Sequence, residues 1–392
     1  MLKKRLKHII IILILLSPVF MFLAWFFTPK TKMVAAIIDK TVLTTEGQEH
    51  ISLDWVLNYK KYTKTSTKFY KRSEDYFGFF PKENEQFDLR GLERFPSNKI
   101  EQLSNDADLV YFTDTYGIYT NEWYEQNNQT ERSGIVYGGL KENDMEFLQK
   151  MKDKNKLIIT EFNTFGSPTA YDIRRKFERT FGLQWTGWTG RYFDNLDTLT
   201  NKELPRWLIK NYLNQHGNKW PFKKSGVAFV NENDQVTILE DSIHLEREIP
   251  QIISNDYGKK RFSLPDEIKY PFWFDIVQNN SAINKTAANY KLYTTEKGSR
   301  ELKKYGIPTS FPAVTYHLDS DYEFYYFSGD FCDNPITMET SYFKGIGIFK
   351  RFFYNDRDKT ERASFFWKFY RPMLQKILED YEKKISTKNN ES

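Results

Sequence analysis

The chain has 392 residues, enough for one large domain or two smaller ones. Its 57 Lys and Arg residues against 52 Asp and Glu residues leave a net charge of only +5, without a long basic block, so we expect no nucleic-acid partner. A single cysteine, Cys332, excludes an internal disulfide framework and a cysteine-based zinc site, and we expect it to be a small buried apolar residue.

Two further features of the composition bear on function. Five histidines leave little material for a histidine-rich metal centre, and we predict neither a metal nor a cofactor. Aromatic residues make up 17% of the chain, which indicates a heavily aromatic core, aromatic binding surfaces, or both. The Lys-, Ile-, Asn- and Tyr-rich composition is typical of an AT-rich bacterial genome.

The N-terminus has the pattern of an uncleaved signal-anchor. Residues 1–8 form a basic segment, and residues 9–27 form an apolar run about as long as a bilayer-spanning helix. The basic flank predicts a cytoplasmic N-terminus and an exported remainder. A cleaved signal peptide is the alternative, but the run ends in Trp25-Phe26-Phe27 without a small-residue cleavage motif nearby. We therefore predict a single-pass protein of the bacterial inner or plasma membrane, with an extracytoplasmic C-terminal domain.

The first part of that domain contains two buried strands that each end in a carboxylate. Residues 33–39 form an apolar run ending in Asp39, and residues 107–114 form another ending in Asp114. Between them we expect a helix over residues 53–62, then a loop with short helical pieces, and a helix near residues 99–103.

Residues 156–182 form the segment around which the rest is organised. Residues 157–160 are a short apolar, β-branched run, as in a strand buried on both faces. A tight turn follows at Gly166, and Ser167-Pro168 has the pattern of a helix N-cap and first-turn proline. Apolar side chains then recur every four residues up to Gly182, which should end the helix. A helix over residues 142–152 precedes the strand.

The second half of the chain predicts further strands and helices. Residues 225–240 have a hairpin pattern around the turn 231–234. The other predicted elements are a strand or loop at 183–192, helices at 205–216, 295–305 and 364–384 (kinked near Pro372), and strands at 273–277, 290–294, 313–318 and 324–328. Residues 386–392 should be a disordered tail.

The alternation of helices and strands predicts an α/β fold with a doubly wound, mostly parallel sheet to which antiparallel strands are added, preceded by one transmembrane helix. Because no clear linker interrupts residues 33–385, we expect one exported domain there, and a two-part domain is the alternative.

These elements resemble the class I glutamine amidotransferase-like superfamily. The residues that carry the resemblance are the strands 34–38 and 109–113, Tyr137-Gly-Gly-Leu with the following helix, and the strand-turn-helix 157–181. The strand Tyr325-Tyr-Phe-Ser-Gly-Asp330 is similar to the closing strand of membrane-anchored envelope proteins with such domains. The resemblance implies the fold.

The catalytic motif of that superfamily is absent. Active members place a nucleophilic cysteine in the turn after the central strand, and here residues 161–168 contain none. His244-Leu-Glu246 has the spacing of the other two catalytic residues of the superfamily, which we interpret as chance without the cysteine. Glutaminase activity is therefore not implied.

Four carboxylates fall at or just after predicted strand ends: Asp39, Asp114, Glu161 and Asp330. In a parallel sheet these ends meet at one edge, where ligands bind. Clustered carboxylates raise one another's pKa and can perform acid–base chemistry or bind a divalent cation. The alternative is that each caps a turn or the start of a helix.

The turn after the predicted strand 157–160 supplies further candidate site residues. Asn163 would line the same crevice, and the candidates for catalysis are Glu161, Asp114 and Ser167. A nucleophilic serine needs a histidine base, and none is near Ser167 in sequence. We therefore favour a plain N-cap role for this serine.

Aromatic side chains flank the predicted crevice. Trp185, Trp188 and Arg191 lie in a glycine-spaced segment, and Tyr116 lies in the loop after the second strand. Flat aromatic faces beside carboxylates and amides suit a carbohydrate, which presents C–H faces and hydroxyls. The alternatives are that they form core, or that they pack against the transmembrane helix of a partner.

Three functions remain open. The first is a membrane-anchored domain that binds a glycan or protein partner in a cell-envelope polymer or secretion system, without amidotransferase activity. The second is a membrane-anchored polysaccharide hydrolase that uses the strand-end carboxylates. The third is a structural subunit of a membrane complex.

Overall fold

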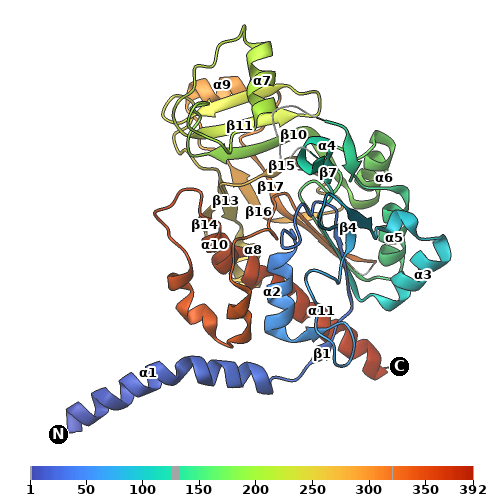
Figure 1. The fold of residues 1–392 in the computed structure, drawn as a ribbon, viewed down its shortest axis with the longest axis vertical. Coiled ribbons are helices and arrows are strands. Elements are labelled where there is room, and N and C mark those ends of the chain that lie inside the picture. Colours follow the sequence, from blue (N-terminus) through green and yellow to red (C-terminus); the bar gives the residue numbers. More distant parts are fainter. Residues whose placement is uncertain (1, 125–132, 320, 392) are drawn as a thin grey trace.

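A large mixed sheet forms the centre of the molecule (Figure 1), in a computed structural model that describes residues 2–124, 133–319 and 321–391. Its ten strands follow the order β14-β13-β16-β17-β18-β9-β6-β2-β4-β5. In that order they span Glu267–Lys269, Gln251–Ser254, Lys285–Lys291, Ser310–Leu318, Glu323–Phe327, Leu157–Glu161, Leu109–Asp114, Ala35–Asp39, Phe77–Pro81 and Phe87–Leu89.

The centre of this sheet is parallel and its flanks are antiparallel. The strands β18, β9, β6, β2 and β4 run parallel, so the predicted adjacency of β2, β6 and β9 is confirmed. The remaining pairings are antiparallel, so the α/β class is confirmed while the expectation of a mostly parallel sheet is wrong. The physical reason for two of these pairings is that β17 and β18, and likewise β4 and β5, are joined by short loops, which can connect only antiparallel neighbours.

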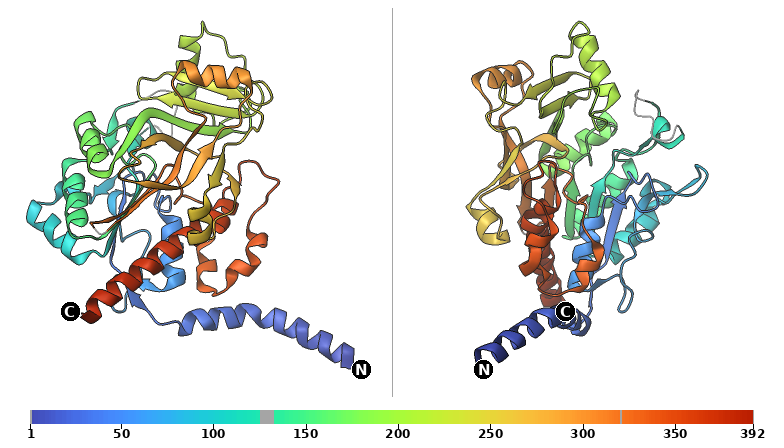
Figure 2. Two further views of the ribbon diagram at one scale, coloured as in Figure 1. Left: turned by 180° about the vertical axis from the view of Figure 1, so that it is seen from behind. Right: turned by 60° about the vertical axis from the view of Figure 1, so that its left-hand side comes forward.

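Helices cover both faces of the sheet, because successive side chains of its central strands point to opposite sides. Ile37 and Tyr111 face one side, with side chains of α2 (Ile51–Lys60) and α11 (Arg371–Glu391). Ile38 and Phe112 face the other. That side is covered by α3 (Ser97–Asp106), α5 (Glu142–Asp153) and α6 (Tyr171–Phe181), and the right-hand view of Figure 2 shows the two helical layers on opposite sides of the strands.

The helix α6 begins later than the sequence predicts. Its N-cap is Ala170 rather than Ser167, so the N-cap expectation for Ser167 is wrong. The chain first makes two tight turns, in which Thr164 N–H donates to the carbonyl of Glu161 and Thr169 N–H donates to the carbonyl of Gly166. Gly182 ends the helix at φ 65°, as predicted.

A second, antiparallel sheet lies at the end of the molecule opposite α1 (Figure 1). Its order is β12 (Val236–Glu240), β11 (Gly226–Asn231), β10 (Leu183–Phe193) and β15 (Phe274–Asn279). The predicted hairpin is therefore confirmed as β11–β12. Helix α7 (Arg206–Gln215) packs on this sheet, and α9 (Glu296–Lys304) lies beside it. A bridge between Phe274 and Gly329 joins β15 to the segment after β18.

Smaller elements complete the described residues. They are β1 (Thr31–Lys32), β3 (Tyr62–Thr63), η1 (Leu92–Arg94), β7 (Ile118–Tyr119), α4 (Thr120–Tyr124), β8 (Ile135–Tyr137), α8 (Asp256–Phe262), η2 (Met338–Tyr342), η3 (Ile346–Phe353), α10 (Ala363–Phe365) and the π-helical η4 (Phe366–Tyr370). The region expected to be mainly loop thus contains β4 and β5, and the strand expected at 290–294 lies earlier, as β16. Helix α11 extends to Glu391, into the segment predicted as a disordered tail.

Helix α1 (Leu2–Phe27) rests on the domain through its last turns. Trp25 is buried, its Nε1 donates to the Asn58 carbonyl at 2.9 Å, and Lys61 Nζ donates to the Phe26 carbonyl at 2.8 Å. In the described part of the chain no helix reaches the length and apolar character needed to cross a bilayer. The signal-anchor stays a prediction from the sequence.

Candidate functional site

The carboxyl ends of β2, β6, β9 and β18 meet at one edge of the central sheet, because these strands are parallel neighbours. Asp39, Asp114 and Glu161 are the last residues of their strands, and Asp330 follows β18. Burial is the main cause of the raised pKa values of Asp114 and Asp330, and neighbouring carboxylates raise them further: Asp39 acts on Asp114, while Asp333, Asp114 and Glu161 act on Asp330.

A cavity of about 340 Å³ lies between this edge and the second sheet. Its volume is within the range of small-molecule sites. Seven of the residues named from the sequence line it: Asp114, Tyr116, Asn163, Ser167, Trp185, Arg191 and Asp330. Three other predicted residues, Asp39, Glu161 and Trp188, do not line the cavity. Each is buried and packs or forms hydrogen bonds inside the domain.

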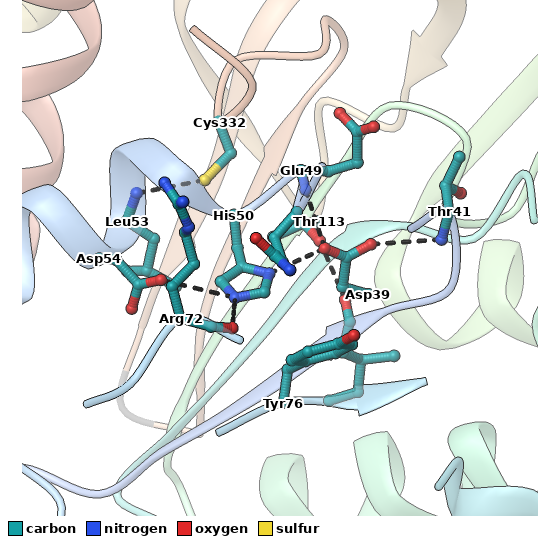
Figure 3. Close-up of polar contacts among 12 residues, drawn as sticks. Asp39, Thr41, Glu49, His50, Leu53, Asp54, Arg72, Tyr76, Thr113 and Cys332 are labelled. Atoms are coloured by element: carbon teal, nitrogen blue, oxygen red, sulfur yellow. Dashed lines mark hydrogen bonds and ion pairs between the residues drawn. The ribbon is translucent and has the colours of Figure 1, made fainter. Parts of the chain in front are cut away.

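Asp39 is fully buried beneath the cavity. Its Oδ2 lies 2.8 Å from His50 Nδ1 and accepts from the backbone N–H of Glu49 at 2.9 Å, while its Oδ1 accepts from the N–H of Thr41 at 3.2 Å (Figure 3). The carboxylate therefore holds both ends of the loop between β2 and α2, and Asp39 is not among the residues that line the cavity.

Glu161 is also fully buried. Its carboxylate accepts from the Tyr111 hydroxyl and from the backbone N–H groups of Phe331 and Cys332 at 2.8 and 2.9 Å. Burial raises its pKa to about 8, although these hydrogen bonds lower it. The turn after β18 closes over this side chain, so it supports the cavity from below instead of lining the crevice as predicted.

The two tryptophans of β10 have different surroundings. The register against β15 shifts between Trp185 and Thr189, which breaks the alternation of side chains along the strand. Trp188 packs in the core, with its ring 5.6 Å from that of Tyr305. Trp185 lies at the cavity, where the Arg174 guanidinium is 5.0 Å from its ring centroid. Of the two, Trp185 alone is placed to contact a ligand.

Three carboxylates gather on one wall. Oxygen atoms of Glu49, Asp330 and Asp333 all lie within 4.8 Å of one another. Burial, and next the charge of Asp333, hold the pKa values of Glu49 and Asp330 well above their usual range. Arg362 donates from Nη1 and Nη2 to Asp333 Oδ2, both at 3.1 Å, and its guanidinium lies 3.6 Å from the Phe272 ring centroid.

Two further aspartates support the site. Asp114 lines the cavity, and Asp275 is buried next to it. Burial raises the pKa of Asp114 to about 7, while the Tyr116 N–H, which donates to it at 2.5 Å, lowers it. Asp275 is buried and accepts from the N–H of Asn163 at 2.9 Å, the Tyr326 hydroxyl at 2.9 Å and the Thr189 hydroxyl at 3.1 Å. It therefore fixes the turn after β9 against the second sheet.

Aromatic rings also line the cavity. Five of them line the cavity and are only half-buried: Tyr116, Tyr119, Trp207, Phe272 and Trp273. Arg191 lies among these rings, 5.0 Å from the centroid of Phe272 and 5.6 Å from that of Trp273, and pairs with Glu203 at 2.7 Å. The cavity thus combines carboxylates, one guanidinium and flat apolar faces.

Ser167 is half-buried at the cavity, but the described residues that line it include no histidine to act as a base. His244 lies elsewhere, where its Nδ1 accepts from the N–H of Glu240 at 3.2 Å. The arrangement gives no support to a serine nucleophile. Cys332 is buried, as predicted, and its Sγ accepts from the Leu53 N–H and the Tyr370 hydroxyl.

Several site residues are missing from the sequence-based set: Glu49, Asp275, Asp333, Arg362, Trp207 and Trp273. Asp333 carries a usable signal, because it lies three residues after Asp330 in the same strand-end turn. Glu49 and Arg362 carry none, since Glu49 lies ten residues after Asp39, at the far end of the loop between β2 and α2, and Arg362 lies 29 residues after Asp333. The sequence predicts that Trp273 begins a strand, and this pattern does not indicate that its side chain lines the cavity.

Comparisons with known proteins identify no family for this chain. No family model matches the chain, and no curated protein matches it. Three similar solved structures are a β-galactosidase from Bacillus circulans, the carbohydrate deacetylase Agd3, and a putative ThuA-like protein from Parabacteroides merdae. The sequence identities are 10%, 7% and 10%, and the TM-scores are 0.27, 0.31 and 0.33, respectively.

The extent of these matches also differs. They cover 58%, 76% and 76% of this chain, and 21%, 29% and 79% of the galactosidase, the deacetylase and the ThuA-like protein. The chain thus spans less than a third of the length of the first two. At TM-scores this low the likeness carries no argument about what this chain binds or does.

Proposed function

We propose that this chain is a membrane-anchored, extracytoplasmic protein that binds a glycan in the cavity between its two sheets. The observation that carries the proposal is the pairing, within one cavity of about 340 Å³, of half-buried aromatic rings with carboxylates. A sugar ring presents C–H faces that stack on aromatic rings, and hydroxyls that donate to carboxylates. The proposed setting is a cell-envelope polymer or secretion system.

The chemistry of the walls points to a particular kind of glycan. Glu49, Asp114, Asp330 and Asp333 accept hydrogen bonds when ionised, and Arg191 donates them. The surplus of carboxylates disfavours a polyanionic polymer that brings no cation of its own. A neutral or amino-bearing sugar fits this cavity best.

The membrane part of the proposal rests on residues 9–27 and their basic flank. A second apolar surface near α1 supports it, since Ile348 and Phe352 of η3 are 85% and 83% exposed. Lys350 and Arg351 lie between them and suit anionic lipid headgroups. Figure 1 shows η3 and α1 at the same end of the molecule, opposite the second sheet.

Binding to an array of bacterial surface glycans, followed by calorimetry with the best binder, tests the cavity. We expect Trp273→Ala and Trp207→Ala each to weaken binding by about tenfold or more, because a stacked ring contributes about 0.5–1.5 kcal/mol beyond its buried area. Tyr171→Ala is the matched control, since Tyr171 is an exposed aromatic residue outside the cavity. Equal binding by all three variants would show that the glycan does not bind in this cavity, and a failure of wild type to bind any glycan would favour the structural-subunit alternative.

A second candidate function is glycoside hydrolysis. It is favoured by Asp114, whose pKa of about 7 suits a general acid at neutral pH. The test is release of reducing ends from the bound glycan by wild type and Asp114→Asn. Turnover that Asp114→Asn abolishes without weakening binding would establish it, and binding without turnover would leave the non-enzymatic proposal. The turn after β9 has no cysteine, so we propose no glutaminase activity.

A further inference from the structure

We propose that Glu49, Asp330 and Asp333 bind a hard divalent cation of the Ca²⁺, Mg²⁺ or Mn²⁺ class. This goes beyond glycan binding, because the ion alone is the ligand, and it departs from our expectation from the sequence, which was that no metal is bound. All the donors are carboxylate oxygens, which these ions prefer, and the cluster offers no thiolate or imidazole for a softer metal.

The spacing of the donors fits one shared ion. The three carboxylate oxygens lie within 4.8 Å of one another. Ca²⁺ binds oxygen at about 2.3–2.6 Å, so two oxygens on opposite sides of one ion are roughly 5 Å apart. The observed limit therefore allows all three groups to contact one ion, and the cavity leaves room for water or ligand hydroxyls to complete the coordination.

The hydrogen-bond pattern shows which groups lack a partner. Asp330 is only 7% exposed and faces the cavity, yet among the described residues no donor contacts its carboxylate. The Glu49 carboxylate likewise has no donor among them, and Figure 3 shows it pointing away from Asp39, which its own backbone N–H contacts. A buried carboxylate without a partner is costly, so it requires either a proton or a cation.

The net charge of the cluster matches one divalent ion. Arg362 pairs with Asp333. Three ionised carboxylates and this one guanidinium carry a net charge of −2, which one divalent ion neutralises.

The two segments that supply the ligands are held together by other contacts. Ser52 N–H donates to the Cys332 carbonyl at 3.1 Å, and Asn334 Nδ2 donates to Ser52 Oγ at 3.0 Å. These bonds tie the turn after β18, with Asp330 and Asp333, to the start of α2, beside Glu49. The ligands are therefore positioned by the fold before an ion arrives, which reduces the ordering cost of binding.

Calorimetry on the purified full chain tests the proposal, after EDTA treatment and without any glycan. CaCl₂, MgCl₂ and MnCl₂ are titrated separately, and each sample is also melted with and without the salt. We expect one ion to bind per chain and to raise the melting temperature, because an ion that binds only the folded state stabilises it. Asp330→Asn and Glu49→Gln should each weaken binding by more than about tenfold, since losing even an outer-shell partner costs about 10–100-fold.

Glu232→Gln is the matched control. Glu232 is another carboxylate that lines the cavity, but it pairs with Arg174 at 2.7 Å and is not one of the three ligands. We expect this variant to bind the ion as wild type does. In EDTA, Asp330→Asn should melt at or above the temperature of wild type, because it removes an unpaired buried charge, which separates loss of the ion from loss of the fold.

The proposal is overturned if none of the three salts gives saturable binding. It is also overturned if Glu232→Gln loses as much affinity as Asp330→Asn. Because no glycan is present, these outcomes are independent of the glycan-binding assay, and either proposal can fail alone.

Discussion

The imidazole Nδ1 of His50 lies 2.8 Å from Oδ2 of Asp39, and both side chains are fully buried (Figure 3). The contact joins the last residue of β2 to the residue just before α2, so it closes the loop that carries Glu49. His50 Nε2 also lies 3.1 Å from the Arg72 carbonyl, which ties the same loop to a third segment. The pair is therefore part of the support of the cavity.

Replacement of this histidine should destabilise the fold. His50→Phe leaves the Asp39 carboxylate buried without its partner, and breaking a buried pair in this way costs about 3–5 kcal/mol. Urea unfolding at neutral pH measures the change. His216→Phe is the control, because His216 is half-buried and stacks on Tyr212, an interaction that phenylalanine keeps. A loss below about 1 kcal/mol in His50→Phe would show that the pair is unimportant.

Glu161 gives a prediction opposite to the one that a crevice carboxylate would give. Its pKa of about 8 means that it is largely protonated at pH 7, so Glu161→Gln should melt close to wild type and bind glycan normally. Glu161→Leu should cost about 2–6 kcal/mol, because two buried N–H groups, of Phe331 and Cys332, lose their acceptor at about 1–3 kcal/mol each. Denaturant unfolding of both variants checks the contrast, and equal stabilities would contradict it.

Asp114 should make the folded chain less stable as the pH rises, whereas a carboxylate with a lowered pKa makes it more stable. Burial raises the pKa of Asp114 from 3.8 to about 7 in the folded chain. A raised folded pKa stabilises the fold in the protonated form, so this contribution is complete below pH 3.8 and is lost as the pH rises to about 7.

Asp114→Asn isolates that contribution. With EDTA present, the melting temperature of wild type minus that of Asp114→Asn should fall as the pH is raised from about 4 to about 7, and should be flat above about pH 8. Asp88→Asn is the control, because Asp88 is exposed and its pKa is lowered, first by the hydrogen bond from Lys82. A constant difference for Asp114→Asn across this range would contradict the assignment.

Topology gives the last prediction. If residues 9–27 span the membrane, an alkaline phosphatase fused after Ser392 should be active and a cytoplasmic reporter at the same position inactive, because the basic flank keeps the N-terminus inside. A fusion after residue 8 serves as the control for the opposite side. Activity of the cytoplasmic reporter alone at Ser392 would exclude an exported domain.

The central strands could be predicted because the residue types within each run are enough to indicate a buried strand. The continuous apolar runs that became β2, β6 and β9 can be satisfied only by burial on both faces. Gly182 was equally clear, since it adopts the left-handed conformation that ends α6. The start of α6 could not be predicted in the same way. A Ser-Pro pair is compatible with both a helix N-cap and a turn, and tertiary contacts decide between the two.

The cavity was only partly predictable for a related reason. The strand-end rule placed Asp114 and Asp330 correctly, but it could not show that the turn after β18 covers Glu161. Nor could it bring Glu49 and Arg362 to the same wall, because their positions depend on the closure of loops far apart in sequence. The rule identifies an edge of the sheet, and packing decides which carboxylates remain open.

The short connection between α1 and the domain limits how the cavity can be used. Thr28, Pro29 and Lys30 are the residues between Phe27 and β1, and β1 pairs at once with β3. With Trp25 docked on α2, no stalk lets the domain swing or extend. If α1 is the anchor, the cavity is held at a fixed height and orientation above the bilayer. The cavity could then bind a polymer only at one distance from the membrane surface. The length of the polymer would therefore decide whether it is bound.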